Sequence, residues 1–266
     1  MHPLLNIAIS AARAAGDVIV RNLHQLSHVK VGFKHNQEIF SEVDVKAEQA
    51  IIQVIRKAYP NHGILAEESG LQSSDDEVMW IIDPIDGTNN FLKDFPMYAV
   101  SIGIQTKGRL THGVIFDPLR RECFYASRGN GAFLNDRRIR VSDSTQLADA
   151  FIGMSSQSKQ EDKLTRFLPI IQSVFMHCGM VRKTGSSALD LAYVASGRLD
   201  GLLTLGLRQW DIAAGIVITQ EAGGMVTDLA GGEGYLKTGD VLAGNPKMVR
   251  ALVQTVATCQ KGSIGA

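Results

Sequence analysis

The most informative stretch of the sequence is Asp83-Pro84-Ile85-Asp86-Gly87-Thr88, where the apolar run Trp80-Ile81-Ile82 leads directly into two carboxylates. Pro84 has no N–H group for a strand ladder, so we expect the strand to end near this residue. Gly87 permits a positive φ or a close backbone approach. From Thr88 on, a short helix can begin with its N–H groups facing an anion. Two carboxylates beside such a helix start suit a hard cation that bridges protein and phosphate oxygens.

Three further acidic elements accompany this stretch. Glu67-Glu68 follows the short apolar run 63–66, Asp211 follows Trp210 at the start of an expected helix, and Asp44 stands three residues after Ser41. Each has an ordinary structural interpretation, as does the turn-forming pair Asp86-Gly87. A solvated surface would explain the glutamates, an N-cap would explain Asp211, and a capping box would explain Asp44. Their combination, in this order, favours a clustered acidic site.

The elements that must position these residues form a mixed α and β pattern. Apolar periodicity predicts amphipathic helices at both ends of the chain: 4–23, 42–58, 161–176, 187–196, 211–222 and 246–258. Between 79 and 134, short β-branched runs predict successive antiparallel strands, with Lys107-Gly108 as a turn. We expect a single domain, 1–266, with two lobes that divide near residue 145.

Composition excludes several functional classes. The chain has 266 residues, with 27 Lys plus Arg against 27 Asp plus Glu, and this balance argues against a general nucleic-acid binder. No apolar run reaches the roughly 18 residues that a membrane span needs, and the N-terminus lacks signal-peptide features. We therefore expect a soluble, cytoplasmic protein. P-loop, G-x-S-x-G and H-E-x-x-H motifs are absent, and Gly129-Asn130-Gly131 is best interpreted as a turn.

Three motifs together resemble the signatures of the inositol monophosphatase family: Glu67-Glu68-Ser69, 83–88, and Trp210-Asp211-Ile212-Ala213-Ala214-Gly215. The block 185–192 resembles the substrate-side helix start of that family. The likeness extends from Met1 to about Pro246 and is strongest with the bacterial SuhB-like branch. It implies a mixed α/β (α+β) fold, layered as an α-β-α-β-α sandwich, in homodimers. It also implies Mg²⁺-dependent, Li⁺-sensitive hydrolysis of phosphate monoesters.

The resemblance also implies residue roles. A first Mg²⁺ would be bound by Glu67, Asp83 and the carbonyl of Ile85. A second would be bound by Asp83, Asp86 and Asp211. Glu68 would hold water beside them, and Thr88 with Asp44 would orient and activate the attacking water. The amides of Gly87 and Thr88 would bind the phosphate. The full set of residues on the substrate side would be Asp86, Gly87, Thr88, Gly185, Ser186, Ser187, Thr204 and Asp211.

One departure bears on the substrate. Inositol-specific members carry a Glu seven residues before the Trp-Asp aspartate, and this chain has Thr204 there. A Thr offers one hydroxyl but loses the charge and the reach. Inositol 1-phosphate is our first expectation. Another sugar or polyol phosphate, fructose 1,6-bisphosphate, 2'-AMP and 3'-phosphoadenosine 5'-phosphate are the alternatives.

A role of a different class is also implied. The resemblance to the SuhB-like branch implies a part in transcription antitermination complexes with RNA polymerase and Nus factors. The segment Arg182-Lys183-Thr184-Gly185-Ser186 resembles the basic segment of that branch, and the pairs Arg120-Arg121 and Arg137-Arg138 add positive charge. The ordinary interpretation of these arginines is a solvated surface.

Overall fold

The computed structural model describes residues 2–33, 39–73, 77–156 and 161–262. Its helices are α1 (Pro3–Asn22), α2 (Glu42–Ala58), α3 (Thr88–Leu92), α4 (Glu161–His177), α5 (Ser187–Ala195), α6 (Gln209–Glu221), α7 (Tyr235–Thr238) and α8 (Pro246–Gly262). Its strands are β1 (Val31–Phe33), β2 (Ile39–Ser41), β3 (Gly63–Ala66), β4 (Gly70–Gln72), β5 (Val78–Asp86), β6 (Ala99–Thr106), β7 (Arg109–Asp117), β8 (Glu122–Ser127), β9 (Gly131–Leu134), β10 (Arg137–Ile139), β11 (Phe151–Ser156), β12 (Met180–Arg182), β13 (Gly201–Leu205), β14 (Met225–Thr227) and β15 (Val241–Gly244).

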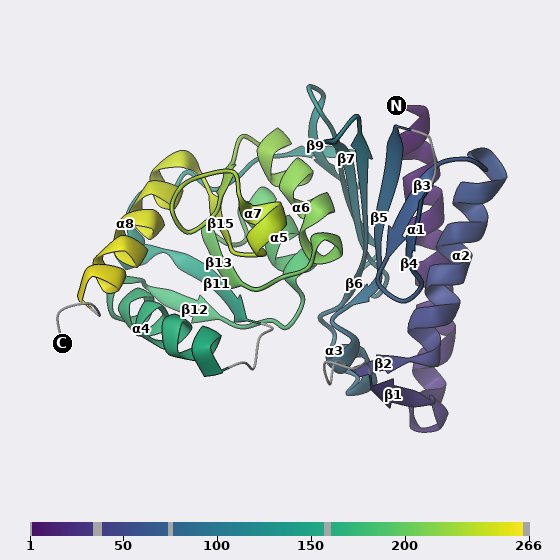
Figure 1. The fold of residues 1–266 in the computed structure, drawn as a ribbon, viewed down its shortest axis with the longest axis horizontal. Coiled ribbons are helices and arrows are strands. Elements are labelled where there is room, and N and C mark those ends of the chain that lie inside the picture. The colour runs from purple at the N-terminus through teal and green to yellow at the C-terminus, as the bar shows by residue number, and fades with distance from the viewer. Residues whose placement is uncertain (1, 34–38, 74–76, 157–160, 263–266) are drawn as a thin grey trace.

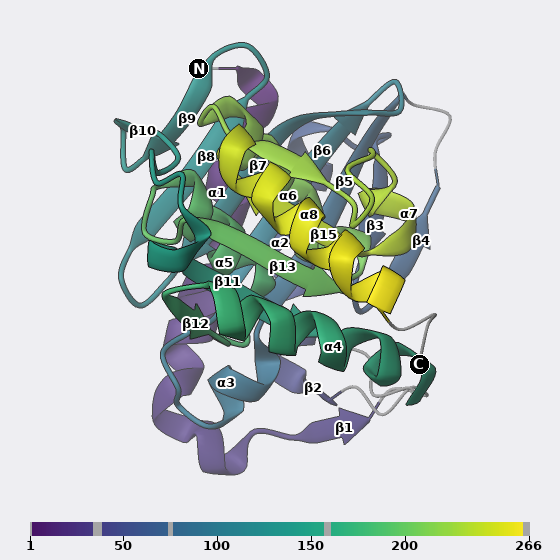
Figure 2. The same ribbon diagram turned by 90° about the vertical axis from the view of Figure 1, so that its left-hand side faces the viewer.

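The elements stack in five layers, α-β-α-β-α (Figure 1). Helices α1 and α2 cover one face of an eight-stranded sheet, and α5 with α6 lies between that sheet and a five-stranded one. Helices α4 and α8 lie side by side on the outer face of the second sheet (Figure 2). The mixed α/β, layered architecture expected from the sequence is therefore confirmed.

The first sheet has the order β10-β9-β8-β7-β6-β5-β3-β4, and the strands from β5 to β10 pair antiparallel, as expected. Strand β3 instead pairs parallel with β5. The carboxyl ends of β3 and β5 therefore meet at one edge of the sheet. This arrangement brings the residues after Ala66 close to Asp83, although they are separate in sequence.

The second sheet has the order β12-β11-β13-β15-β14, with β11 parallel to both β12 and β13. The sequence patterns predicted helices in this half and missed these strands. They are short, and β13 and β15 are buried along their whole length, so they lack the alternation that marks a half-buried strand.

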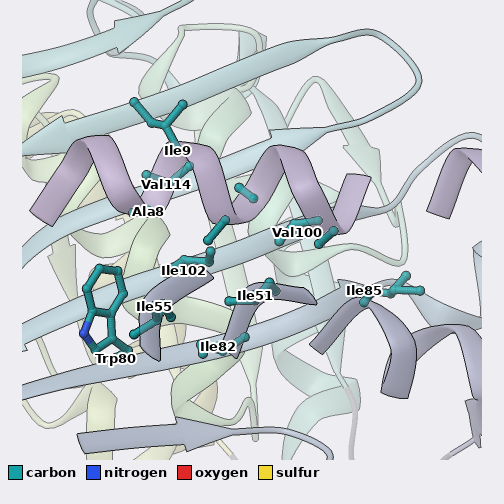
Figure 3. Close-up of a cluster of buried hydrophobic side chains, with 14 of the residues drawn as sticks. Ala8, Ile9, Ile51, Ile55, Trp80, Ile82, Ile85, Val100, Ile102 and Val114 are labelled. Atoms are coloured by element: carbon teal, nitrogen blue, oxygen red, sulfur yellow. The ribbon is translucent and has the colours of Figure 1, made fainter. Parts of the chain in front are cut away.

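Helix α1 owes its apolar composition to the core. Ala8 and Ile9 of α1 belong to the same buried hydrophobic cluster as Val100, Ile102 and Val114 of the first sheet (Figure 3). The helix that continues to His28 is long and apolar enough to span a membrane, although the sequence contains no continuous apolar run of that length. Half of its 18-residue apolar stretch is buried inside the protein, as expected of a core helix.

The sequence predicts that strand β5 ends near Pro84, and it ends two residues later, at Asp86. Strand β5 continues through Pro84 to Asp86, and its pairing with β6 shifts register between Asp83 and Asp86. Because Pro84 cannot donate to the ladder, the strand bulges there instead of ending. The bulge still delivers both carboxylates at the end of the strand.

Candidate metal and catalytic site

Three buried aspartates lie together where the first sheet meets the middle helices. Asp83 and Asp86 come from the end of β5, and Asp211 comes from the first turn of α6. Each offers one carboxylate oxygen, and these oxygens all lie within 4.8 Å of one another. Their side chains are at most 4% exposed. Such a set of hard oxygen donors could hold a metal ion.

The electrostatic environment of Asp83 also favours a bound metal ion. Burial first, and then the charges of Glu67, Asp86 and Asp211, raise the pKa of Asp83 well above its usual range. A hydrogen bond with Glu67 raises it further. The Oδ1 of Asp83 also accepts the backbone N–H of Ile85 at 3.0 Å, which fixes the carboxylate. A divalent cation would relieve the repulsion within this cluster.

Asp86 connects the site to α5. Its Oδ2 accepts the hydroxyl of Ser186 at 2.6 Å and the backbone N–H of Ala188 at 2.7 Å. The Asp86 carboxylate, which belongs to the first sheet, thus accepts a hydrogen bond from the first turn of α5 in the middle helix layer. Burial raises the pKa of Asp86 to about 7, although both hydrogen bonds act to lower it.

Glu67 and Glu68 follow β3 and are half-buried. The backbone N–H of Glu67 donates to the carbonyl of Ile82 at 3.1 Å, which extends the contact between β3 and β5. Both glutamates line a groove of about 480 Å³ together with Glu48. The hydrogen bond between Glu67 and Asp83 brings Glu67 to the aspartate cluster, whereas Glu68 lines the groove.

Asp44 and Thr88 meet although they belong to different elements. The hydroxyl of Thr88, the first residue of α3, donates to Oδ1 of Asp44 at 2.8 Å and lies 3.1 Å from the carbonyl oxygen of Ile85. The other oxygen of Asp44 accepts the backbone N–H and the hydroxyl of Ser41 at 2.8 and 2.5 Å. The expected capping box at the start of α2 is present. Burial raises the pKa of Asp44 to about 6, against these hydrogen bonds.

Gly87 needs to be glycine for two reasons. Its φ is 100°, and a Cβ at this position would lie 2.8 Å from the carbonyl oxygen of Met97 and 3.3 Å from that of Gly185. The backbone of the Asp86–Thr88 turn therefore lies against the segment that precedes α5. This close approach places Gly87 and Gly185 at one site.

Asn90 is a site-organising residue that the sequence interpretation missed. Its side-chain amide donates to the carbonyl of Met97 at 2.6 Å and to the carbonyl of Thr184 at 2.9 Å. It thereby joins α3 to the segment before α5. The second contact spans 94 residues in the sequence, and no local pattern signals it.

The remaining substrate-side residues differ in exposure. Gly185 is exposed, whereas Ser186 and Ser187 are buried at the start of α5, where Ser186 is the N-cap. Thr204 lies in β13 with no exposed surface, and within the described ranges its hydroxyl has no hydrogen-bond partner. Its role in binding substrate stays a prediction.

The basic residues have mixed environments. Arg182 and Lys183 are exposed, and the guanidinium of Arg182 lies 4.9 Å from the ring centroid of Phe151. Arg120 is instead engaged in an ion pair with Asp117 at 2.8 Å. Gly129 and Asn130 lie in the turn between β8 and β9 that the sequence indicated, and Gly131 begins β9.

This fold and this acidic site define the family. The model of the Inositol monophosphatase family matches residues 1–261, and the chain belongs to that family. The Nus factor SuhB of Escherichia coli K12 is 46% identical over 254 residues, which are 95% of each chain. The crystal structure of the extragenic suppressor protein SuhB from Bartonella henselae superposes with a TM-score of 0.93 at 38% identity, over 96% of this chain and 98% of that one. The structure of inositol monophosphatase from Anabaena gives a TM-score of 0.85 at 34% identity, over 96% and 95%.

Proposed function

We propose that this protein is a Mg²⁺-dependent phosphatase of small phosphate monoesters, with inositol 1-phosphate as its first candidate substrate. The observation that carries the proposal is the group of buried carboxylates of Asp83, Asp86 and Asp211. Membership of the inositol monophosphatase family supports it. Because the donors are all carboxylate oxygens, the site suits Mg²⁺ better than a softer metal.

The roles of the metal-binding residues are carried over from the family resemblance, and the cluster of Asp83, Asp86 and Asp211 supports them. Asp83, Glu67 and the carbonyl of Ile85 would hold one Mg²⁺, and Asp83, Asp86 and Asp211 would hold a second. When bound, the ions neutralise the phosphate and stabilise both the attacking and the leaving oxygen. Glu68, which lines the same groove as Glu67, would hold water beside this site. A Li⁺ ion at the second position would inhibit.

The protein's own acid–base chemistry belongs to Asp44 and Thr88. The attacking water donates to the Thr88 hydroxyl oxygen while that hydroxyl donates to Asp44. The 2.8 Å hydrogen bond between Thr88 and Asp44 supports this relay. Asp44 must be unprotonated to act as the base, and its hydrogen bonds from Ser41 hold it in one orientation.

The substrate would bind between the Gly87 turn and the start of α5. The amides of Gly87 and Thr88 would bind the phosphate, and Gly185, Ser186 and Ser187 would lie toward the leaving group. The close approach of Gly87 to Gly185 supports this placement. Thr204 in place of a glutamate leaves other sugar phosphates, fructose 1,6-bisphosphate, 2'-AMP and 3'-phosphoadenosine 5'-phosphate as alternative substrates.

Phosphate release from inositol 1-phosphate, fructose 1,6-bisphosphate and 2'-AMP tests the proposal. We expect release that requires Mg²⁺, is inhibited by Li⁺ and is lost in Asp83→Asn. Release from another ester alone would keep the mechanism and change the substrate. If folded protein with Mg²⁺ releases phosphate from none of the three, the proposed function is wrong.

A second candidate function is that of a transcription antitermination partner of RNA polymerase and Nus factors. The relatives named Nus factor SuhB and the exposed Arg182 and Lys183 favour it. In a pull-down with RNA polymerase and Nus factors, Arg182→Ala is expected to weaken capture, whereas Arg250→Ala, an exposed arginine on α8, is not. Absence of capture by the wild-type protein would exclude this role. We also propose that the protein is cytoplasmic and forms a homodimer. Sedimentation of the pure protein tests the homodimer.

A further inference from the structure

We propose that Glu48 is a positioning residue that holds the Glu67-Glu68-Ser69 turn in place for metal binding, an inference that rests on the proposed function. Glu48 lies on α2, and its side chain is only 3% exposed. Its Oε2 accepts the backbone N–H of Glu68 at 2.8 Å, and its Oε1 accepts that of Ser69 at 2.9 Å. One buried carboxylate thus binds two successive amides of the turn that carries Glu67.

These two hydrogen bonds complete the anchoring of the turn. The β3–β5 ladder ends at the pair Ala66 and Ile82, and the amide of Glu67 still reaches the carbonyl of Ile82. Beyond that point the next two amides face α2 instead of β5. A carboxylate that accepts backbone N–H groups forms stronger hydrogen bonds than a neutral acceptor does. The turn is therefore fixed between β5 on one side and Glu48 on the other.

The position of Glu48 on its helix relates the turn to the base. Glu48 follows Asp44 by four residues, so the two side chains lie one above the other on the same face of α2. The helix itself is held in the core by Val43, Ala47 and Ile51, which have no exposed surface. One rigid helix thereby fixes the positions of both the proposed base, Asp44, and the turn that carries the proposed metal ligand Glu67. A change in the helix would move both together.

Glu48 acts through Glu67 and Glu68, not on substrate. Both of its oxygens accept backbone amides, and Glu67 in turn is hydrogen-bonded to Asp83. Loss of such an outer contact typically lowers metal affinity by about 10- to 100-fold. The expected signature is therefore a weaker Mg²⁺ affinity with turnover recovered at saturating Mg²⁺. Loss of a purely structural residue would lower thermal stability and leave the Mg²⁺ affinity unchanged.

The test compares Glu48→Gln with the wild-type protein by calorimetric titration with Mg²⁺, without substrate. The introduced side-chain amide would turn its own N–H donors toward one of the two backbone N–H groups. This variant therefore keeps the size of the side chain and breaks one contact. We expect the Kd for Mg²⁺ to rise about 10- to 100-fold. Glu42→Gln is the matched control, because Glu42 lies on the same helix and pairs with Lys46, away from the acidic cluster.

The titrations distinguish failure of the proposed function from failure of the positioning role of Glu48. A wild-type protein that binds no divalent cation would contradict the proposed function itself. Wild-type binding with an equal Kd in Glu48→Gln would overturn the positioning role alone, even if the variant melts earlier. If Glu48→Gln does not fold, Glu48→Asp decides, since it keeps both acceptors on a shorter side chain. A Kd raised several-fold in Glu48→Asp supports the role, and an unchanged Kd overturns it.

Discussion

The hydroxyl of Thr88 donates to the carboxylate of Asp44 across 2.8 Å, which joins the start of α3 to the first turn of α2. Both oxygens of Asp44 accept hydrogen bonds, one from Thr88 and the other from Ser41. The carboxylate is therefore held in one orientation, and in the proposed mechanism Thr88 relays to it a proton from water. Several consequences of this arrangement can be measured.

The pH dependence of turnover should show the protonation of Asp44. Burial raises the pKa of Asp44 to about 6, and only its unprotonated form is a base. We expect kcat/KM to fall about tenfold for each pH unit below the midpoint of this titration. Bound Mg²⁺ places that midpoint below the metal-free value, because a nearby cation favours the carboxylate. A profile measured from pH 4 to 8 at saturating Mg²⁺ tests this, and activity that rises as the pH falls would contradict it.

Substitution of Thr88 separates its hydroxyl from its shape. Thr88→Val keeps the side-chain volume but removes the relay hydroxyl, so we expect kcat to fall about 10²-fold or more. Thr88→Ser keeps the hydroxyl and is the matched control, for which we expect a loss of less than about tenfold. Steady-state kinetics with Mg²⁺ saturating both variants distinguishes them. Equal activity of the valine and serine variants would exclude the relay.

The variant Asp83→Asn should lose phosphatase activity and be more stable than the wild-type protein when no metal is bound. Burial and three neighbouring carboxylates raise the pKa of Asp83, so its charged form destabilises the metal-free protein. At pH 8 the unfolded state carries this charge, so removal of it should raise the free energy of unfolding of the metal-free protein. Urea unfolding in EDTA measures this gain. With Mg²⁺ added, the wild-type protein should gain stability and the variant should not. A variant that is less stable in EDTA would argue against repulsion in the cluster.

Asp190 predicts a second pH dependence, that of stability. It is fully buried in α5, accepts the hydroxyl of Thr184 at 2.7 Å, and has a pKa that burial raises to about 8. Between about pH 4 and pH 8 the native state retains a proton that the unfolded state releases, so stability falls as pH rises. Relative to Asp190→Asn, the metal-free wild-type protein should lose about 1.4 kcal/mol per pH unit in this window. Parallel stability curves for the two proteins would contradict the raised pKa.

The sequence predicted local features better than distant ones. The capping box at Ser41 and the apolar stripe of α2 are encoded within one helix, and both were found. The bulge at Pro84 was not foreseen, because continuation of β5 depends on pairing with β6 on the far side of the turn. A missing donor predicts a break in the ladder, but the neighbouring strand decides whether the chain bulges or ends.

The same distinction applies to the site. Motifs identified the expected carboxylates, whose side-chain chemistry is visible in the sequence. Glu48 and Asn90 were missed because each binds backbone groups of a remote segment, and a backbone amide or carbonyl carries no sequence signal. Strand β13, which carries Thr204, was missed for a related reason: burial on both faces removes the alternation that identifies a strand.

Asp44→Asn tests the central claim most directly. The asparagine keeps the shape of the side chain and cannot accept a proton from Thr88. The measurement is the rate of phosphate release by wild type and variant at saturating Mg²⁺, with Mg²⁺ binding to both confirmed by calorimetry. We predict bound Mg²⁺ and a kcat lower by about 10²- to 10⁴-fold. Near-normal turnover by Asp44→Asn with Mg²⁺ bound would contradict the assignment of Asp44 as the base.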